Sequence, residues 1–466
     1  MTDLAFLTAT ELGPLIRTKQ VSPVELTNHI LKRIEKMNPT LNAYITPLNE
    51  FAIQQAKEVE NHIMRGNYKG PLHGIPIGIK DNYNTKDIPT TAGAKIFKES
   101  MPNYSATSVT RLLEAGGIML GKLNMHQLGA GLTGINPSFG SARNPWNNDY
   151  IAGGSSSGSG ASLAAGLATL TTGTDTFGSI RFPAAMNGVY GLKPTYGLVS
   201  TYGVIPAAWS LDHAGPMARS VSDLALMLNY MAGYDSHDPA SLNISSTDYS
   251  QEINKGIKGI KIGIPTYYLE GLDTEVEKLF KQAVSTLQAL GAEIKEIQIP
   301  ELNMSTFAGY SIVSGEAAAY NYNLLQESSE EFEQDARVLL LAGTLTNAPK
   351  YLRAQQARRK LSKGFEKAFQ SVDILVCPTM PITTPAFNKN WVEQNLDVIK
   401  LGLPFTVPAN LAGIPSLSVP MGVDSNGLPN GMQLMGNHLS EKLLFQVGHA
   451  WESTNPLKIK LEDINN

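Results

Sequence analysis

Residues 149–175 read DYIAGGSSSGSGASLAAGLATLTTGTD, and no charged side chain stands between the two terminal aspartates. The window between them is long enough to cross a membrane. Its content argues against that, because Gly, Ser, Thr and Ala fill 20 of its 25 positions and such a segment is too polar for lipid. We therefore interpret it as a glycine- and serine-rich segment of a water-soluble protein and not as a membrane span.

The composition of the 466-residue chain limits its class. Hydrophobic residues make up 42% and charged residues 17%, against roughly 25% charged residues in an average soluble domain, so a large core can form. The net charge of −4 argues against direct binding of nucleic acid. One cysteine, Cys377, excludes an internal disulfide and a cysteine-based zinc site. The first residues, MTDLAFLTATELG, lack the features of a signal peptide, so we expect a cytoplasmic protein without a membrane segment.

Predicted strands and helices alternate along most of the chain. Helices are expected at 22–34, 50–64, 107–116, 160–168 and 274–290, with a mostly helical region at 311–370. Strands are expected at 74–82, 117–121, 170–175, 260–264, 293–298, 373–377 and 416–420. The alternation indicates an α/β protein with a largely parallel or mixed sheet.

We expect residues 1–466 to form a single large domain. Within it we distinguish an N-terminal helical arm (1–70), a core (71–233), a polar connecting segment (234–256) and a C-terminal lobe (257–466) that contains the helical region 311–370.

Several common kinds of site are not supported by the sequence. The eight histidines are scattered without metal-ligand spacing, so we expect no metal and no cofactor. The run GGSSSGSG (153–160) lacks the lysine of a P-loop, and Leu163 stands where a dinucleotide motif needs its third glycine. The segment GSSSG (154–158) fits the nucleophile elbow of α/β-hydrolases, with Ser156 as nucleophile, but NPWNNDYIAG before it cannot form the required strand.

These exclusions leave one kind of enzyme, a serine hydrolase whose base is lysine in place of histidine. A lysine can act as the base once it is neutral, which requires its pKa to fall by about 3 units from about 10.4. Lys80 is a candidate, because it ends the apolar run GIPIGIK (74–80). Taken alone this is weak, since lysines that end strands are usually surface charges.

Several segments in order make the chain resemble the amidase signature family. These are GIPIGIKDN (74–82), GGSSSGS (153–159), GTDTFGSIRFPAA (173–185), GLKPTYGLVS (191–200), SLDHAGPMARSVSD (210–223) and PANLAGIPSLSVP (408–420). The resemblance covers nearly the whole chain and implies a central mixed β-sheet covered by helices on both faces.

The resemblance also implies the site residues. It makes Ser179 the nucleophile, Ser155 the bridging hydroxyl and Lys80 the base, with a cis peptide bond between Ser155 and Ser156. The oxyanion and substrate contacts that it implies are Thr176, Phe177, Gly178, Gly129, Ala130 and Gly131. Asp175 and Arg181 flank the nucleophile loop, and we interpret them as a structural ion pair.

Phe177 departs from the family pattern, which usually has glycine or another small residue there. A phenylalanine at positive φ would be strained. Its ring must either fill part of the acyl pocket or displace the loop, so we expect a narrowed or reshaped substrate site.

The resemblance leaves three functions open. We favour a free-standing amidase that hydrolyses small carboxamides or C-terminal peptide amides. The alternative is the A subunit of the glutamyl-tRNA amidotransferase, which releases ammonia from glutamine; its relatives carry an aspartate where this chain has Leu403-Pro404. Arg358 could hold a substrate carboxylate in either case. A third hypothesis is an inactive amidase fold kept for binding. We expect a small-molecule or peptide amide as substrate; a homodimer is compatible with the sequence, and a heteromeric complex is less favoured.

Overall fold

One mixed sheet of eleven strands runs through the computed structural model, which describes residues 3–245 and 247–457. The strands are β1 (Tyr44–Pro47), β2 (Pro76–Lys80), β3 (Ile118–Leu123), β4 (Leu170–Asp175), β5 (Tyr190–Lys193), β6 (His213–Ala218), β7 (Lys261–Pro265), β8 (Glu293–Ile297), β9 (Ile374–Pro378), β10 (Ser416–Val423) and β11 (Pro429–Gly436). Their order in space is β1-β3-β2-β4-β6-β5-β10-β11-β9-β7-β8.

The strand pairing explains how distant segments meet. Strand β2 pairs parallel with β3 and β4, and β7 pairs parallel with β8 and β9. The middle of the sheet is antiparallel, from β4 through β6, β5 and β10 to the hairpin of β10 with β11. The neighbouring strands β2 and β4 bring residue 80 close to residues 170–175, which lie far away in the sequence.

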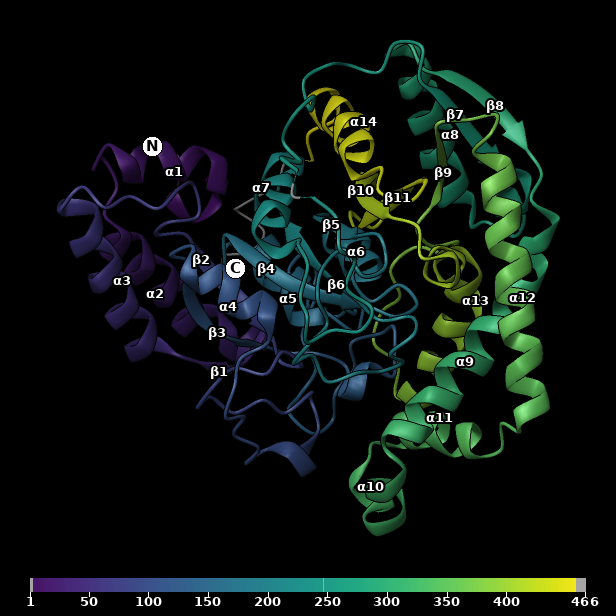
Figure 1. The fold of residues 1–466 in the computed structure, drawn as a ribbon, viewed down its shortest axis with the longest axis horizontal. Helices are drawn as coiled ribbons and strands as arrows, with labels where there is room; N and C mark the ends of the chain where they lie inside the picture. The colour runs from purple at the N-terminus through teal and green to yellow at the C-terminus, as the bar shows by residue number, and fades with distance from the viewer. Residues whose placement is uncertain (1–2, 246, 458–466) are drawn as a thin grey trace.

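The helices flank this sheet and also form a separate group beyond it (Figure 1). They are α1 (Ala9–Arg17), α2 (Pro23–Leu41), α3 (Asn49–Met64), α4 (Thr107–Glu114), α5 (Ser157–Ala164), α6 (Arg181–Asn187), α7 (Val221–Met231), α8 (Thr274–Ala289), α9 (Ser305–Tyr320), α10 (Tyr322–Glu327), α11 (Gln334–Thr344), α12 (Ala348–Ala368), α13 (Trp391–Ala412) and α14 (Glu441–Thr454). Helices α5 and α6 contact each other and the sheet, as do α7 and α14. Helices α9, α11, α12 and α13 pack mainly on one another, at the opposite end of the molecule from α1, α2 and α3 (Figure 1).

The predicted α/β class with a mixed sheet is confirmed, and most predicted elements are present. The Ser22-Pro23 start of α2 forms as expected, because the Glu25 N–H donates to Ser22 Oγ over 3.1 Å and proline occupies the first helical position. Helix α1 lies within the expected helical arm, whereas β1 is a strand inside it. The sequence patterns also did not predict β5, β6, β11, α7, α13 or α14. The division into arm, core and lobe remains a prediction.

The uncharged segment between Asp149 and Asp175 belongs to a longer buried part of the chain. Every residue from 151 to 195 is buried. The β-branched threonines of β4 lie inside the sheet, and the small residues of α5 allow close packing. The backbone of α5 approaches Ala43 so closely at Gly158 that a Cβ there would lie 2.2 Å from the Ala43 carbonyl oxygen. Burial therefore explains the lack of charge, since an unpaired charge in this interior would be costly.

None of the helices within the described residues is both long and apolar enough to cross a lipid bilayer.

Candidate active site

Lys80 ends β2 in the interior of the molecule, with a side chain that is fully buried. Its side-chain Nζ donates to Ser155 Oγ and to Thr174 Oγ1, each over 2.7 Å. Its backbone N–H donates to Thr172 Oγ1 over 2.9 Å. Thr172 and Thr174 are two residues apart on β4, so both side chains lie on the face that meets Lys80. The sequence analysis did not single out these threonines, although their alternation in LTTGTD was a usable signal.

The surroundings of Lys80 favour a neutral amine. Burial lowers its pKa to about 7, and the carboxylates of Asp175 and Asp212 partly oppose this decrease. The shift has the size that a lysine base needs to be substantially deprotonated near neutral pH. Lysines that end strands are usually charged and at the surface. Lys80 is instead buried in the interior.

Ser155 receives the Lys80 hydrogen bond at the start of the glycine- and serine-rich segment. The expected position of the cis peptide bond was wrong, because the cis bond joins Gly154 to Ser155. Only glycine fits before it, since a Cβ at Gly154 would lie 2.6 Å from the Gly134 nitrogen. The following peptide is not cis, and the Ser156 N–H donates to the Ser179 carbonyl oxygen over 3.2 Å. That bond holds the segments of Ser155 and Ser179 side by side.

Ser179 lies in the loop between β4 and α6, with only 1% of its surface exposed. Its hydroxyl has no hydrogen-bond partner among the described residues. The structure therefore brings Lys80 and Ser155 into direct contact and places the Ser179 segment beside Ser155, without a hydrogen bond between the two serine hydroxyls.

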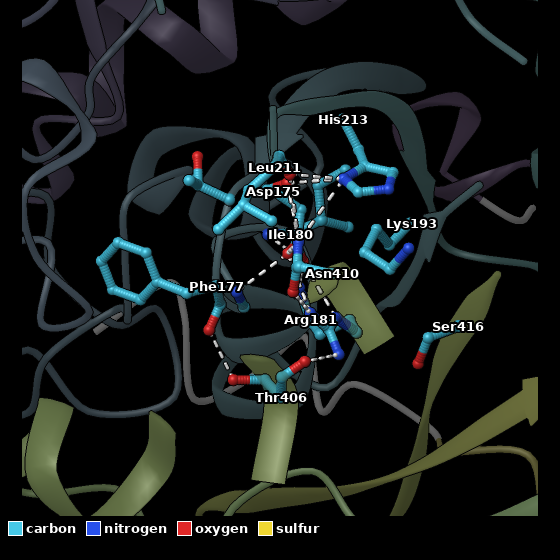
Figure 2. A network of polar contacts seen from close by, with 12 residues as sticks. Asp175, Phe177, Ile180, Arg181, Lys193, Leu211, His213, Thr406, Asn410 and Ser416 are labelled. Atoms are coloured by element: carbon cyan, nitrogen blue, oxygen red, sulfur yellow. Dashed lines mark hydrogen bonds and ion pairs between the residues drawn. The ribbon is translucent and has the colours of Figure 1, made fainter. Parts of the chain in front are cut away.

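An ion pair between Asp175 and Arg181 holds the nucleophile loop, as the sequence predicted (Figure 2). Arg181 donates to the Asp175 carboxylate through Nη2 over 2.9 Å and through Nε over 3.0 Å. The same carboxylate accepts the N–H groups of Gly178 and Ile180. Burial alone would raise the pKa of Asp175, but the Arg181 guanidinium and the Asn410 amide hold it well below its usual range. The loop is therefore wrapped around a carboxylate that stays ionised.

Helix α13 completes this network from the other end of the chain (Figure 2). Asn410 accepts from Arg181 Nη2 over 2.6 Å and donates to Asp175 Oδ1 over 2.9 Å. The Thr406 carbonyl accepts from Arg181 Nη1 over 2.9 Å, and the Thr406 hydroxyl donates to the Phe177 carbonyl. Neither residue was expected at the site, because nothing in FTVPAN (405–410) indicates a partner more than 220 positions away.

The backbone donors of the nucleophile loop are only partly free. The Gly178 N–H is engaged by Asp175 over 2.8 Å. Among the described residues, no acceptor lies within hydrogen-bond range of the N–H groups of Thr176, Phe177 or Ser179. Of the N–H groups of Thr176, Phe177, Gly178 and Ser179, three are therefore available to a ligand.

The turn at Gly129–Gly131 lies beside the serines. A Cβ at Gly129 would be 3.6 Å from Ser155 Oγ, so the absence of a side chain leaves the hydroxyl approachable from this side. The N–H groups of Gly129 and Ala130 bond within the turn, to the carbonyls of His126 and Gln127. The backbone that this turn can offer a ligand is therefore mainly carbonyl oxygen and the Gly131 N–H.

A buried polar chain fixes this turn to the helices of the C-terminal half. His126 Nε2 and Asp335 Oδ2 are 2.8 Å apart, and Asn395 Nδ2 donates to the same Asp335 oxygen over 2.8 Å. Asn395 Oδ1 accepts from the Leu132 N–H over 3.1 Å and from the Thr133 hydroxyl. The sequence analysis treated His126 as one of eight scattered histidines and did not find this arrangement.

Phe177 does not displace the loop. It is not among the residues with positive φ, whereas Gly178 is, at +130°. The Asp175 bonds to Gly178 and Ile180 are intact, and the Phe177 ring points away from the Asp175–Arg181 network (Figure 2). The conditional expectation of backbone strain at this residue is therefore not met, and its ring is 3% exposed in an apolar core.

Arg358 is occupied by the protein itself. Its Nε donates to the Leu411 carbonyl over 2.8 Å, and its Nη2 donates to the Ser210 carbonyl over 3.0 Å. Its Nη1 reaches the Ser210 hydroxyl over 3.2 Å. These bonds hold the 210 loop against α12 and α13, and they argue against a free carboxylate receptor. The neighbouring basic residues of α12 form an exposed face; they are Arg353, Arg359, Lys360, Lys363 and Lys367.

Comparison with known proteins covers nearly the whole chain. The family model described as Amidase matches residues 25–445. The A subunit of glutamyl-tRNA(Gln) amidotransferase from Geobacter metallireducens is 40% identical, over 97% of this chain and 97% of that protein. The protein of the same name from Cyanothece sp. is 41% identical, over 96% and 97%.

Solved structures of several kinds share the fold. A structure described as a vestigial complex connected with the origins of an s-triazine catabolic enzyme has a TM-score of 0.91 at 31% identity, covering 97% of this chain and 100% of that one. The A subunit of the Thermotoga maritima amidotransferase has a TM-score of 0.84 at 31% identity, covering 98% and 96%. The native peptide amidase of Stenotrophomonas maltophilia has a TM-score of 0.82 at 31% identity, covering 96% of each chain.

Proposed function

The chain belongs to the Amidase family, which makes it an enzyme of amide C–N bonds, and from that premise we propose that it hydrolyses a carboxamide through an acyl group on Ser179. The observation that carries the proposal is the buried contact of Lys80 with Ser155. A neutral amine beside a serine hydroxyl is a general base that needs no histidine.

The acylation step follows from this contact. Lys80 takes the proton of Ser155, Ser155 takes the proton of Ser179, and Ser179 Oγ attacks the amide carbon. The C–N bond then breaks, and the relay returns the proton to the leaving nitrogen, so ammonia or an amine departs. Water attacks the resulting ester with the same relay as base, which restores the Ser179 hydroxyl and releases the carboxylate.

The oxyanion is held by backbone groups of the loop. The N–H groups of Thr176, Phe177 and Ser179 are the donors without a partner among the described residues, while Asp175 keeps that of Gly178. Donors that are already oriented stabilise charge that develops in the transition state, and losing one such bond typically reduces kcat about 10²- to 10³-fold. The Asp175–Arg181 pair serves this step indirectly, by fixing the loop.

A second candidate is the release of ammonia from glutamine within an amidotransferase. The observation that favours it is the name of the curated relatives, which are 39–41% identical to this chain and are called the A subunit of that enzyme. These names support the second candidate more than the first, against the preference drawn from sequence. The absence of an aspartate at Leu403-Pro404 argues the other way.

The two candidates are separated by an assay of ammonia release. The purified chain is incubated with L-glutamine, with acetamide, and with a C-terminal peptide amide, and Ser179→Ala is the matched control for each. The first proposal expects ammonia from a simple amide without any added subunit. Ammonia from glutamine alone, or activity that appears only after co-expression with partner subunits, would reverse the order. Undiminished activity in Ser179→Ala would overturn the acyl-serine mechanism.

A further inference from the structure

The side chain of Phe177, two residues before Ser179, is buried in an apolar core. Two cavities of about 10 Å³ each have Phe177 in their walls, together with Ala130, Val313 and Leu339. A volume of about 10–15 Å³ is the least that holds one water molecule. Each cavity is therefore too small for more than about one water molecule.

The first cavity reaches Ser155 through one of its wall residues, Gly129. Its wall includes Gly129 and Ala207. A Cβ at Gly129 would lie 3.4 Å from the Ala207 side chain and 3.6 Å from Ser155 Oγ. The second cavity continues among helices α9, α11 and α13, where its wall includes Tyr310, Ile399 and Leu403. The two cavities share the ring of Phe177, so loss of the ring would join them into one apolar recess that begins beside Ser155.

The direction of this recess fits the acyl part of a substrate. In the proposed reaction the leaving nitrogen must face Ser155 and Lys80, which return its proton. The acyl group therefore extends away from Lys80. The Phe177 ring also points away from the Asp175–Arg181 network (Figure 2). Its apolar cluster includes residues of helices α9, α11 and α13.

We propose that Phe177 closes the acyl pocket, so that the enzyme accepts amides of formyl- or acetyl-sized acids and holds the larger part of its substrate on the amine side. This inference rests on the proposed acyl-serine chemistry and narrows its substrate class. It also disfavours glutamine, whose acyl part is long and carries an ammonium and a carboxylate. Among the described residues, no charged side chain stands in either cavity wall to receive those charges.

The test is a series of acyl lengths on one amine. Acetyl, butyryl and hexanoyl amides are compared by kcat/KM for the native enzyme, Phe177→Leu and Phe177→Gly. One methylene in an apolar pocket changes selectivity by about 10- to 200-fold, so we expect the hexanoyl-to-acetyl ratio to rise by about 100-fold or more in Phe177→Gly. Phe177→Leu should lie between the two.

Phe365→Leu is the matched control. Phe365 is buried in the same apolar core, on α12, but lines neither cavity. The Phe365→Leu variant should leave the hexanoyl-to-acetyl ratio of kcat/KM unchanged. A changed ratio in the Phe177 variants alone would then reflect an opened pocket, because a general loosening of the core would change the ratio in Phe365→Leu as well. A native enzyme that prefers hexanoyl to acetyl amides, or an equal change of ratio in Phe365→Leu, would overturn the proposal.

A covalent probe tests the pocket without depending on the amine. Alkyl fluorophosphonates phosphonylate an active serine, because Ser179 Oγ forms the bond to phosphorus while the P–F bond breaks and fluoride leaves with the displaced proton. We expect the methyl probe to label the native enzyme much faster than the octyl probe, and Phe177→Gly to accept both, as read by intact-protein mass. Rapid octyl labelling of the native enzyme would overturn the closed pocket alone. No labelling at Ser179 in any variant would overturn the proposed function, and the pocket inference with it.

Discussion

The side-chain nitrogen of Lys80 lies 2.7 Å from the hydroxyl oxygen of Ser155, and both side chains are buried. In water a lysine would be protonated at neutral pH and could not accept a proton from serine. Here burial lowers the pKa of Lys80 to about 7, so a large fraction of the side chain is neutral at neutral pH.

The pH dependence of activity should follow the titration of Lys80. Its pKa is lowered to about 7, and only the neutral amine can act as base. We expect kcat/KM to be level above pH 8 and to fall about tenfold per unit well below pH 7. A profile measured from pH 5 to 9, with thermal unfolding recorded at each pH as control, checks this. A rate that increases as the pH falls below 7 would contradict it.

Lys80→Met should abolish activity and raise stability at pH 7. The folded pKa of Lys80 is about 7 against about 10.5 for the free side chain, so between these values the unfolded chain binds a proton that the folded chain does not. The native free energy of unfolding should therefore decrease as the pH falls from 10 to 7, by up to about 1.4 kcal/mol per unit. The methionine variant lacks this slope. Urea unfolding of both proteins across that range measures the difference, and parallel curves would refute the assignment.

Ser179→Ala and Ser155→Ala should both lose activity and differ in stability. The Ser179 hydroxyl is buried without a partner among the described residues, so its removal should leave the free energy of unfolding unchanged or about 1 kcal/mol higher. Removal of the Ser155 hydroxyl takes away one of the two side-chain acceptors of Lys80 and should lower stability by about 1–3 kcal/mol. Calorimetry of the two variants side by side gives the comparison, and equal stabilities would speak against it.

Arg181→Met should be strongly destabilising. It would leave the carboxylate of Asp175 buried without its cation, which costs about 3–5 kcal/mol in known buried pairs. Arg353→Met, on the exposed face of α12, is the control and should change stability by less than about 0.5 kcal/mol. Denaturant titration measures both. A mild effect at Arg181 would mean that the loop does not depend on the pair.

Asn395→Ala should affect substrate binding through the turn at Gly129–Gly131. The change removes the acceptor of the Leu132 N–H and one partner of Asp335, and we expect KM to increase several-fold with a smaller change in kcat. The decrease of kcat/KM below about pH 7 should be the same as in the native enzyme, because Lys80 is unchanged. A change confined to kcat would indicate that the turn acts on the chemical step.

The pattern of the sequence predicted those parts of the fold whose signals are local. Apolar periodicity and the Ser22-Pro23 cap located α2, and short apolar runs located β2, β3 and β9. Helix α13 could not be read this way, because Pro404 and Pro408 lie inside it and proline normally interrupts a helix. The strand order, which joins β5 to β10 across more than 200 residues, has no local signal at all.

The candidate site was predictable in its members more than in its geometry. A buried lysine at the end of an apolar strand was a physical hypothesis, whereas Ser155 and Ser179 came from resemblance. The engagement of the Gly178 N–H by Asp175 and the cis bond at Gly154–Ser155 were not foreseen. Both depend on backbone geometry, which residue types at a given spacing do not specify.

The bonds of Asn410 to Asp175 span 235 residues, and this has a consequence for biosynthesis. At about 5–20 residues per second, a ribosome reaches Asn410 roughly 10–50 s after it has added Asp175. During that interval the nucleophile loop is present without the helix that closes its ion-pair network. The newly made chain therefore cannot complete this hydrogen-bond network until Asn410 has emerged and helix α13 has docked.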